Sequence, residues 1–251
     1  MNQNRNYCLS IAGFDPSSGA GLSADLKTFE MHKVYGFSVC SAITVQNDIE
    51  FQSCDWISKE KIIAQLEILL KRFPISVFKI GIVESWEILL EILDFIESKV
   101  EKPKIILDPV LKSSSNFVFH SEENDSVFEK VLQKCYLITP NYQEIQQISP
   151  DKNVEETISY LNQFTNIFLK GGHKESALGE DILYLKNGEE FIFKPKGNHV
   201  SEKHGSGCVL ASGIAANLAK KLPIGKACQK AKDYTYQFLN STENLLGYHN
   251  L

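Results

Sequence analysis

Short apolar segments that end in a glycine or a polar residue alternate along this chain with longer segments of helical spacing, and this alternation limits the fold more than any other feature. Val77–Ile80 and Lys104–Leu107 have the length and composition of buried strands, whereas Lys59–Lys71 carries its apolar residues at helical spacing. Strands that alternate with helices favour a mostly parallel sheet with helices on both faces. Because no linker or repeat interrupts the pattern, we expect one α/β domain over residues 1–251.

The same patterns give bounds for the individual elements. The expected strands are Tyr7–Ala12, Phe37–Val45, Val77–Ile80, Lys104–Leu107, Tyr136–Thr139 and Ile167–Lys170, followed by a hairpin of Asp181–Lys186 and Glu190–Phe193 around Asn187-Gly188. The expected helices are Leu22–His32, Lys59–Lys71, Trp86–Ser98, Asn141–Ile148, Val154–Phe164, Gly207–Lys220 and Ala227–Leu239. Polar residues and glycines recur at the strand ends, and ligands of open α/β sheets bind at the carboxyl ends of the strands, so we expect one site there.

Composition excludes several classes of protein. With 26 Lys and Arg against 31 Asp and Glu, the net charge is −5, which argues against an overall electrostatic grip on nucleic acid. No apolar segment approaches the ~20 residues that span a membrane, and the polar stretch Met1–Asn6 does not start a signal peptide. The six cysteines form no CxxC pair. We therefore expect a cytoplasmic protein that binds neither nucleic acid nor membrane.

The sharpest chemical feature is the segment His204–Cys208, a glycine-rich turn that opens a helix. The start of a helix presents free backbone N–H groups and the positive end of the helix dipole, which together bind anions and phosphates. Cys208 falls in the first helical turn, where we expect the pKa of the thiol to be lowered. The alternative is a glycine-rich loop beside a buried cysteine with no ligand.

Other candidates follow the strands. Asp108 and Glu144 are candidate Mg²⁺ ligands, because that ion takes few protein oxygens and keeps several waters. The alternative for Glu144 is a helix-start charge that only satisfies the dipole. Lys170 suits a phosphate, or is a solvated strand end. The loop Gly13–Gly21 can wrap a small polar ligand, or is a flexible turn.

A series of segments, taken together, resembles the motifs of one known enzyme family. It consists of Ser10–Gly21, Ala24–Phe29, Tyr35-Gly36, Ala42–Asn47, Lys79–Gly81, Leu107–Val110, Ile138–Asn141, Lys170–His173 and His204–Cys208. In this order, over residues 7 to about 220, they resemble the hydroxymethylpyrimidine/phosphomethylpyrimidine kinases, which are ribokinase-like enzymes.

The resemblance implies a three-layer α/β sandwich, often dimeric, that uses ATP and Mg²⁺. It implies phosphorylation of 4-amino-5-hydroxymethyl-2-methylpyrimidine, and of the monophosphate, in thiamine biosynthesis or salvage. The implied substrate pocket contains Gly13, Asp25, Gln46, Ile82 and Val110. The implied phosphate-transfer residues are the amides of Gly205, Ser206 and Gly207, with Cys208 as base, Lys170 and Asn141 on ATP phosphates, and Asp108 and Glu144 on Mg²⁺.

The chain departs from the family pattern at several positions. Ser18 replaces a glycine, Ile82 a methionine and Ser206 a threonine, and the polar loop Leu111–Asn116 differs from the usual small-residue stretch. Two other classes stay open. One is a pyridoxal/pyridoxine kinase of vitamin B6 salvage, with the same fold. The other is a non-catalytic pyrimidine-binding module, which has no need of the anion-binding glycines.

Overall fold

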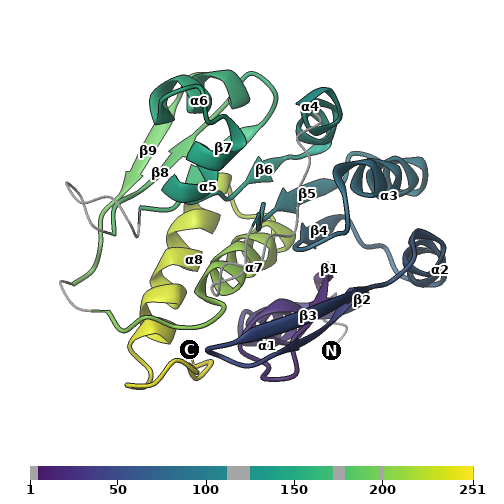
Figure 1. The fold of residues 1–251 in the computed structure, drawn as a ribbon, viewed down its shortest axis with the longest axis horizontal. Helices are drawn as coiled ribbons and strands as arrows, with labels where there is room; N and C mark the ends of the chain where they lie inside the picture. The colour runs from purple at the N-terminus through teal and green to yellow at the C-terminus, as the bar shows by residue number, and fades with distance from the viewer. Residues whose placement is uncertain (1–4, 112–124, 172–178, 198–199, 251) are drawn as a thin grey trace.

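The computed structural model describes residues 5–111, 125–171, 179–197 and 200–250. Within them one sheet runs in the order β3-β2-β1-β4-β5-β6-β7-β8-β9 (Figure 1). The pairs from β2 through β7 are parallel, and β3, β8 and β9 add antiparallel strands at the two edges. The strands are β1 (Tyr7–Phe14), β2 (Tyr35–Gln46), β3 (Phe51–Trp56), β4 (Val77–Ile80), β5 (Lys104–Leu107), β6 (Leu137–Ile138), β7 (Asn166–Leu169), β8 (Asp181–Tyr184) and β9 (Glu190–Phe193).

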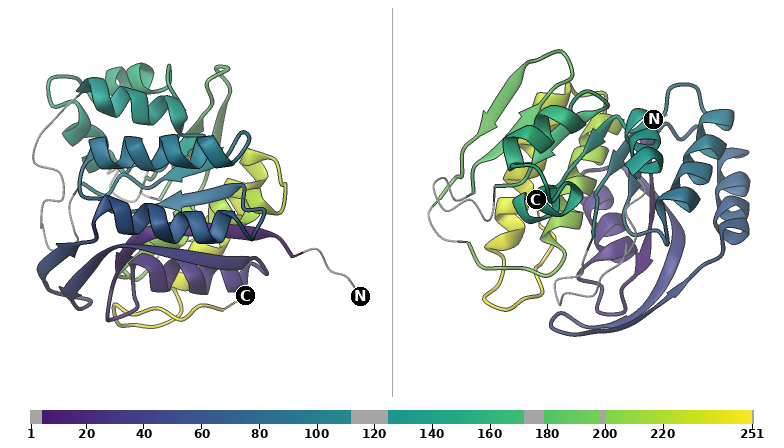
Figure 2. Two further views of the ribbon diagram at one scale, coloured as in Figure 1. Left: turned by 90° about the vertical axis from the view of Figure 1, so that its right-hand side faces the viewer. Right: turned by 45° about the horizontal axis from the view of Figure 1, so that its top comes forward.

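Helices cover both faces of this sheet (Figures 1 and 2). One face carries α1 (Gly21–Met31), α7 (Ser206–Ala219) and α8 (Ile224–Leu239). The other carries α2 (Lys59–Leu70), α3 (Trp86–Lys99), α4 (Asp125–Lys134), α5 (Tyr142–Ile148) and α6 (Val154–Leu161). The expected three-layer α/β sandwich is therefore confirmed.

Alternation along the buried strands builds two cores. In β5, Ile105 and Leu107 pack with α2 to α6, whereas Ile106 packs with α7 and α8. Successive side chains of a strand point to opposite faces, so a continuous apolar run serves both layers at once. On β4 the residues that face the α7 side are Val77 and Lys79. Lys79 is buried, and it is a charged exception in this pattern that becomes important at the site.

Two elements were not expected from the sequence, β3 and α4. β3 is an edge strand with no buried residue, so its sequence lacks a buried apolar run. Its pairing with β2 still extends that strand to Gln46. The expected hairpin around Asn187-Gly188 is confirmed, with Gly188 in the left-handed region.

Candidate functional site

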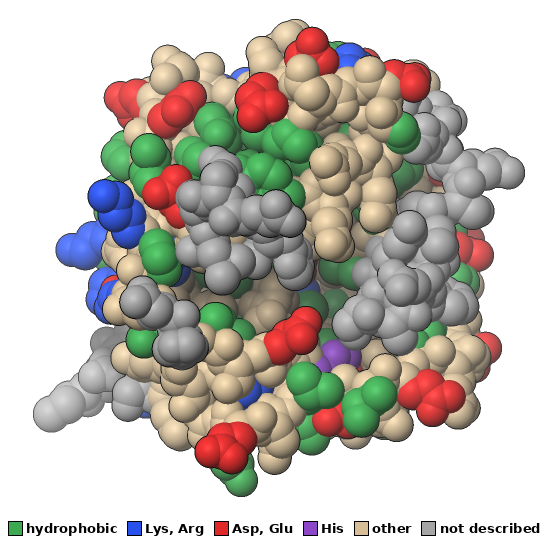
Figure 3. Space-filling view, turned by 60° about the vertical axis from the view of Figure 1, so that its left-hand side comes forward, with side chains coloured by type: hydrophobic (Ala, Val, Ile, Leu, Met, Phe, Trp, Pro, Cys, Tyr) green, Lys and Arg blue, Asp and Glu red, His purple; other side chains and the backbone are tan. Residues whose placement is uncertain are grey.

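A cavity of about 760 Å³ lies at the carboxyl ends of the central parallel strands, on the face of the molecule that is hollowed in Figure 3. β1 lies between β2 and β4, so the chain crosses from one side of β1 to the other, and such switch points form ligand crevices. Asp25 does not line the cavity. The predicted site residues that do are Gly13, Gln46, Ile82, Asp108, Val110, Asn141, Glu144, Lys170, Gly205, Ser206, Gly207 and Cys208.

The start of α7 forms the floor of the cavity. Gly205 precedes the helix with φ +77, and a Cβ there would lie 2.0 Å from the carbonyl oxygen of Gly19, so only glycine fits. The Ser206 amide donates to the carbonyl of Lys203 at 3.3 Å. Within the described residues the amides of Gly207 and Cys208 have no hydrogen-bond partner, which leaves both for an anion.

A buried contact holds this turn to the first glycine-rich loop. His204 Nε2 lies 3.0 Å from Asp15 Oδ2, and the Ala20 amide donates to the same oxygen at 2.8 Å. Burial alone raises the pKa of Asp15, but hydrogen bonds from His204, Ala20 and Ser17 outweigh it and hold the pKa below its ordinary value. The loop is thus a fixed support of the α7 turn. Ser18 in this loop has φ 61, a conformation that glycine adopts at less cost.

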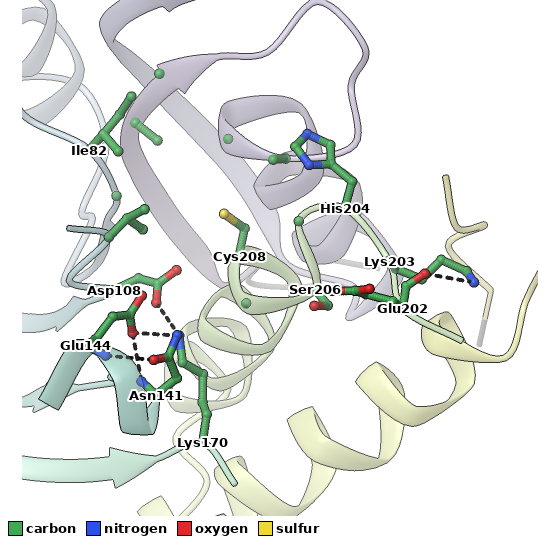
Figure 4. Close-up of a pocket in the computed structure, with 18 of the residues that line it drawn as sticks. Ile82, Asp108, Asn141, Glu144, Lys170, Glu202, Lys203, His204, Ser206 and Cys208 are labelled. Carbon is green, nitrogen blue, oxygen red and sulfur yellow. Dashed lines mark hydrogen bonds and ion pairs between the residues drawn. The ribbon is translucent and has the colours of Figure 1, made fainter. Parts of the chain in front are cut away.

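Cys208 lies in the first turn of α7 and faces the cavity (Figure 4). The expectation of a lowered thiol pKa is wrong. The pKa of Cys208 is raised to about 11, chiefly by burial. The charge of Lys79 opposes this rise, and the charges of Asp25 and Asp108 add to it. The position at a helix start is therefore outweighed by desolvation and by the neighbouring carboxylates.

Lys170 joins the two acidic residues of the site (Figure 4). Its Nζ lies 3.1 Å from Asp108 Oδ1 and 3.5 Å from Glu144 Oε2, and Thr139 also donates to Asp108 Oδ1. Burial lowers the pKa of Lys170, but the two carboxylates outweigh burial and raise it overall. The Asp108 pKa is lowered because Lys170 and Lys79 outweigh burial, whereas burial raises the pKa of Glu144.

Asn141 and Glu144 form a capping box at the start of α5. The Asn141 amide donates to Glu144 Oε2 at 2.7 Å, and the Glu144 amide donates to Asn141 Oδ1 at 2.8 Å. Glu144 therefore caps the start of the helix, which is the alternative role that the sequence allows for it. It also faces the cavity beside Lys170.

The donor set also fits Mg²⁺. No group of three or more His, Cys, Asp or Glu side chains suited to a metal occurs within the described ranges. No described residue donates a hydrogen bond to Asp108 Oδ2 or to Glu144 Oε1. Each carboxylate therefore keeps one hard oxygen for a metal ion. Mg²⁺ commonly takes one or two carboxylates together with waters and substrate phosphates, so two oxygens suffice.

Asp25 lies behind the wall of the cavity rather than in it. Its carboxylate is fully buried, pairs with Lys79 at 3.0 Å, and accepts from the hydroxyls of Ser10 and Ser212. Lys79 lines the cavity and was missed in the sequence analysis. A lysine within an otherwise apolar strand is the signal that identifies it, since a buried charge needs a partner.

The opposite side of the cavity is uncharged. A Cβ on Gly13 would lie 2.7 Å from Cδ1 of Ile82, so the two residues define a narrow wall. Gln46 Nε2 donates to Thr44 Oγ1 at 2.8 Å, and Thr44 Oγ1 donates to the carbonyl of Phe14 at 2.8 Å. Thr44 is another cavity residue that sequence reasoning missed; its position two residues before Gln46, on the same strand face, would have revealed it.

A second cavity of about 360 Å³ adjoins the first. The two share Lys170, Val200, Ser206, Gly207 and Leu239. The second extends toward α8, where Lys232 pairs with Asp181 at 2.8 Å and donates to the carbonyl of Phe193. The start of α7 therefore lies between two cavities.

A mostly parallel sheet that brings an anion-binding helix start, a lysine and two carboxylates to one edge has the parts of an enzyme that transfers phosphoryl groups by positioning and charge neutralisation. The fold and the site together define a kinase of ribokinase-like architecture. The phosphomethylpyrimidine kinase family matches residues 15–250, and the chain belongs to that family. It is accordingly a phosphotransferase that uses ATP.

Relatives of similar length support this placement. The hydroxymethylpyrimidine/phosphomethylpyrimidine kinase of Aquifex aeolicus is 34% identical over 250 residues, which cover 94% of this chain and 95% of the relative. The enzyme of the same name from Haemophilus influenzae is 32% identical over 244 residues, covering 92% and 90%.

Solved structures agree in fold. The crystal structure of a phosphomethylpyrimidine kinase from Clostridium difficile 630 has a TM-score of 0.77 and 33% identity, covering 92% of this chain and 98% of that chain. A pyridoxal kinase from Staphylococcus aureus in complex with ADP has a TM-score of 0.84 at 23% identity, covering 98% and 92%, which is a likeness of fold alone. In the described part of the chain, no helix has the length and apolarity to cross a membrane.

Proposed function

We propose that this protein transfers the γ-phosphoryl group of ATP to the hydroxymethyl oxygen of 4-amino-5-hydroxymethyl-2-methylpyrimidine, and then to the resulting monophosphate. The observation that carries the proposal is the position of the α7 start between two cavities. The pyrimidine would occupy the uncharged side of the larger cavity, and the nucleotide would reach its charged side from the adjoining cavity. The transferring group would then pass the free amides of the turn. The names of the relatives support the choice of pyrimidine.

The start of α7 supplies the anion-binding groups. The amides of Gly207 and Cys208 stabilise the equatorial oxygens of the transferring group, and Gly205 and Ser206 shape the turn that presents them. Cys208 accepts the proton of the substrate hydroxyl, which gives a rate that rises with pH because burial raises the pKa of the thiol.

Charged residues beside the start of α7, in the same cavity, hold the phosphates. Asp108 and Glu144 hold Mg²⁺, directly or through water, and the bound ion supplies positive charge that neutralises the phosphates. Lys170 exchanges its carboxylate partners for a phosphate oxygen, and Asn141 keeps Glu144 in place through the capping box.

We further propose a homodimer in the cytoplasm. Phe14 and Ile43 are register partners on β1 and β2, and with Val45 they expose apolar side chains, between 44% and 49% accessible, near the edge of the sheet. A second copy of the chain would cover this patch. An Ile43→Lys variant that stays the same size as wild type by light scattering would argue against this interface.

The proposed cytoplasmic location rests on the cysteines. All six cysteines are free, as in a reducing compartment.

The test is ADP release in steady state with the aminopyrimidine alcohol, its monophosphate and pyridoxal as separate acceptors. We expect turnover with both pyrimidines and a kcat/KM at least about 10-fold lower for pyridoxal. Turnover with pyridoxal alone would assign the protein to vitamin B6 salvage. Ligand binding without ADP release would indicate a non-catalytic module.

A further inference from the structure

Thr44 and Gln46 project from the same face of β2 and both line the cavity. Thr44 is 3% exposed, so its hydroxyl has little access to water. Its oxygen has two neighbours at hydrogen-bond distance, each at 2.8 Å: the carbonyl oxygen of Phe14 and the side-chain amide of Gln46.

The chemistry of these groups fixes the direction of both hydrogen bonds. A backbone carbonyl can only accept, so the single proton of the Thr44 hydroxyl is committed to Phe14. The hydroxyl oxygen can then only accept from Gln46. The end of the carboxamide that faces Thr44 must therefore be the NH₂ group. The opposite orientation would place two acceptors together or leave the Phe14 carbonyl without its donor.

We propose that Thr44 is a specificity-determining residue, because it fixes the Gln46 carboxamide so that the carbonyl oxygen and one N–H remain for the ligand in a set order. This inference rests on the proposed function. A carboxamide in this order matches an exocyclic amino group beside a ring-nitrogen acceptor, the pair that lets Gln read adenine. A 4-oxo pyrimidine carries the reverse pair, an exocyclic acceptor beside a ring N–H, and binds well only if the carboxamide turns over.

The experiment measures equilibrium binding by calorimetry without ATP, so it does not depend on turnover. The probes are 4-amino- and 4-oxo-5-hydroxymethyl-2-methylpyrimidine, and the proteins are wild type, Thr44→Val and Thr44→Ser. We expect wild type to favour the amino compound by about 10-fold or more, since one buried polar group is left unpaired with the oxo compound. Thr44→Val should reduce the preference to within about threefold, because valine cannot hold the amide in one orientation. Thr44→Ser keeps the hydroxyl and should keep the preference.

Each outcome decides the question. Equal binding of the two compounds by wild type, or an unchanged preference in a folded Thr44→Val, would overturn the role of Thr44. If circular dichroism shows that Thr44→Val does not fold, Thr44→Ala replaces it, because alanine removes the hydroxyl and adds no new methyl group. The measured quantity is again the ratio of the binding constants of the amino and oxo compounds. Wild type that binds neither compound would overturn the proposed function itself, which separates the two failures.

Discussion

The two sides of the cavity work by different physics. We call Gly13, Thr44, Gln46 and Ile82 the pyrimidine wall, and Asp108, Glu144, Lys170, Gly207 and Cys208 the phosphate wall. The pyrimidine wall carries no charge and orders its polar atoms through a hydrogen-bond relay. The phosphate wall holds charges that shift one another's pKa values. Under the proposed function, substrate choice would depend on the direction of hydrogen bonds, and reaction rate on charge and anion binding.

The walls should also respond differently to substitution. On the phosphate wall Lys170 contacts both carboxylates, so a change at one residue alters the environment of the others. On the pyrimidine wall a change affects one ligand contact. We expect changes on the phosphate wall to lower kcat for every acceptor, and changes on the pyrimidine wall to alter the ratio between acceptors.

The largest effect is expected for Gly207→Ala. A Cβ at this position would meet Lys170 Nζ at 3.4 Å and Asp108 Oδ2 at 3.9 Å, so the protein should fold, but the methyl enters the space of the phosphoryl group. We expect kcat to fall roughly 10²- to 10³-fold for all acceptors. Gly225→Ala, at the second residue of α8 in ordinary contact with Phe191, is the matched control. Wild-type kcat in folded Gly207→Ala would place the phosphoryl group elsewhere.

Cys208→Ala should lower kcat by about 10²-fold while the aminopyrimidine still binds. The thiolate is the active form of a base, and the thiol pKa is raised to about 11, so wild-type kcat should rise with pH through the neutral range. The variant should lose that rise. Cys54→Ala, outside the cavity on β3, is the control. Near-normal turnover of Cys208→Ala would leave this residue with only a structural role.

Glu144→Gln should raise the Mg²⁺ concentration for half-maximal rate roughly 10- to 100-fold. Glutamine can still close the capping box, so the change removes charge and keeps the helix start. Burial raises the pKa of Glu144, so this carboxylate takes up a proton at a higher pH than an ordinary glutamate does. Acidification should therefore weaken Mg²⁺ activation of wild type at that higher pH. The variant has no carboxylate at this position and should lack the effect.

The control for this variant is Glu156→Gln, which changes the same position of the capping box in α6 and is exposed. Its Mg²⁺ titration should match wild type. An unchanged titration in Glu144→Gln would mean that Glu144 only caps its helix.

The smallest effect is expected for Gln46→Leu, on the pyrimidine wall. Leucine neither donates nor accepts, so kcat/KM for the aminopyrimidine should fall about 10-fold, with a smaller fall for pyridoxal. The exposed Gln52→Leu on β3 is the control. A variant that keeps the wild-type ratio between the two alcohols would show that the wall does not select through Gln46.

The sequence predicts the sheet well because apolar runs and strand-end glycines are local signals. β3 escaped prediction because Phe51–Trp56 lies at an edge and buries little. α4 buries Phe128, Val131 and Leu132 at helical spacing, but it follows a polar stretch that hides its start. The bounds of the polar loop Leu111–Asn116 cannot be compared, since residues 112–116 lie outside the described ranges.

The site is less local. Strand-end residues such as Asp108 and Lys170 were predicted together because parallel strands end at one edge. The place of Asp25 and the pKa of Cys208 depend on depth of burial and on charges from distant segments, which a linear sequence does not display. The pairing of His204 with Asp15 joins positions 189 residues apart and had no sequence signal.

The ion pairs of Lys170 affect how a charged ligand approaches the site. Because this cation lies between Asp108 and Glu144, and Lys79 pairs with Asp25, most of the charge in this region is balanced before a nucleotide arrives. A nucleotide would then enter by exchange of ionic partners at Lys170. Long-range steering requires an unbalanced field, and salt screens such fields over about 8–10 Å. The association rate of the nucleotide should therefore change little with ionic strength, and encounter should depend on collision frequency and on the shape of the cavity mouth.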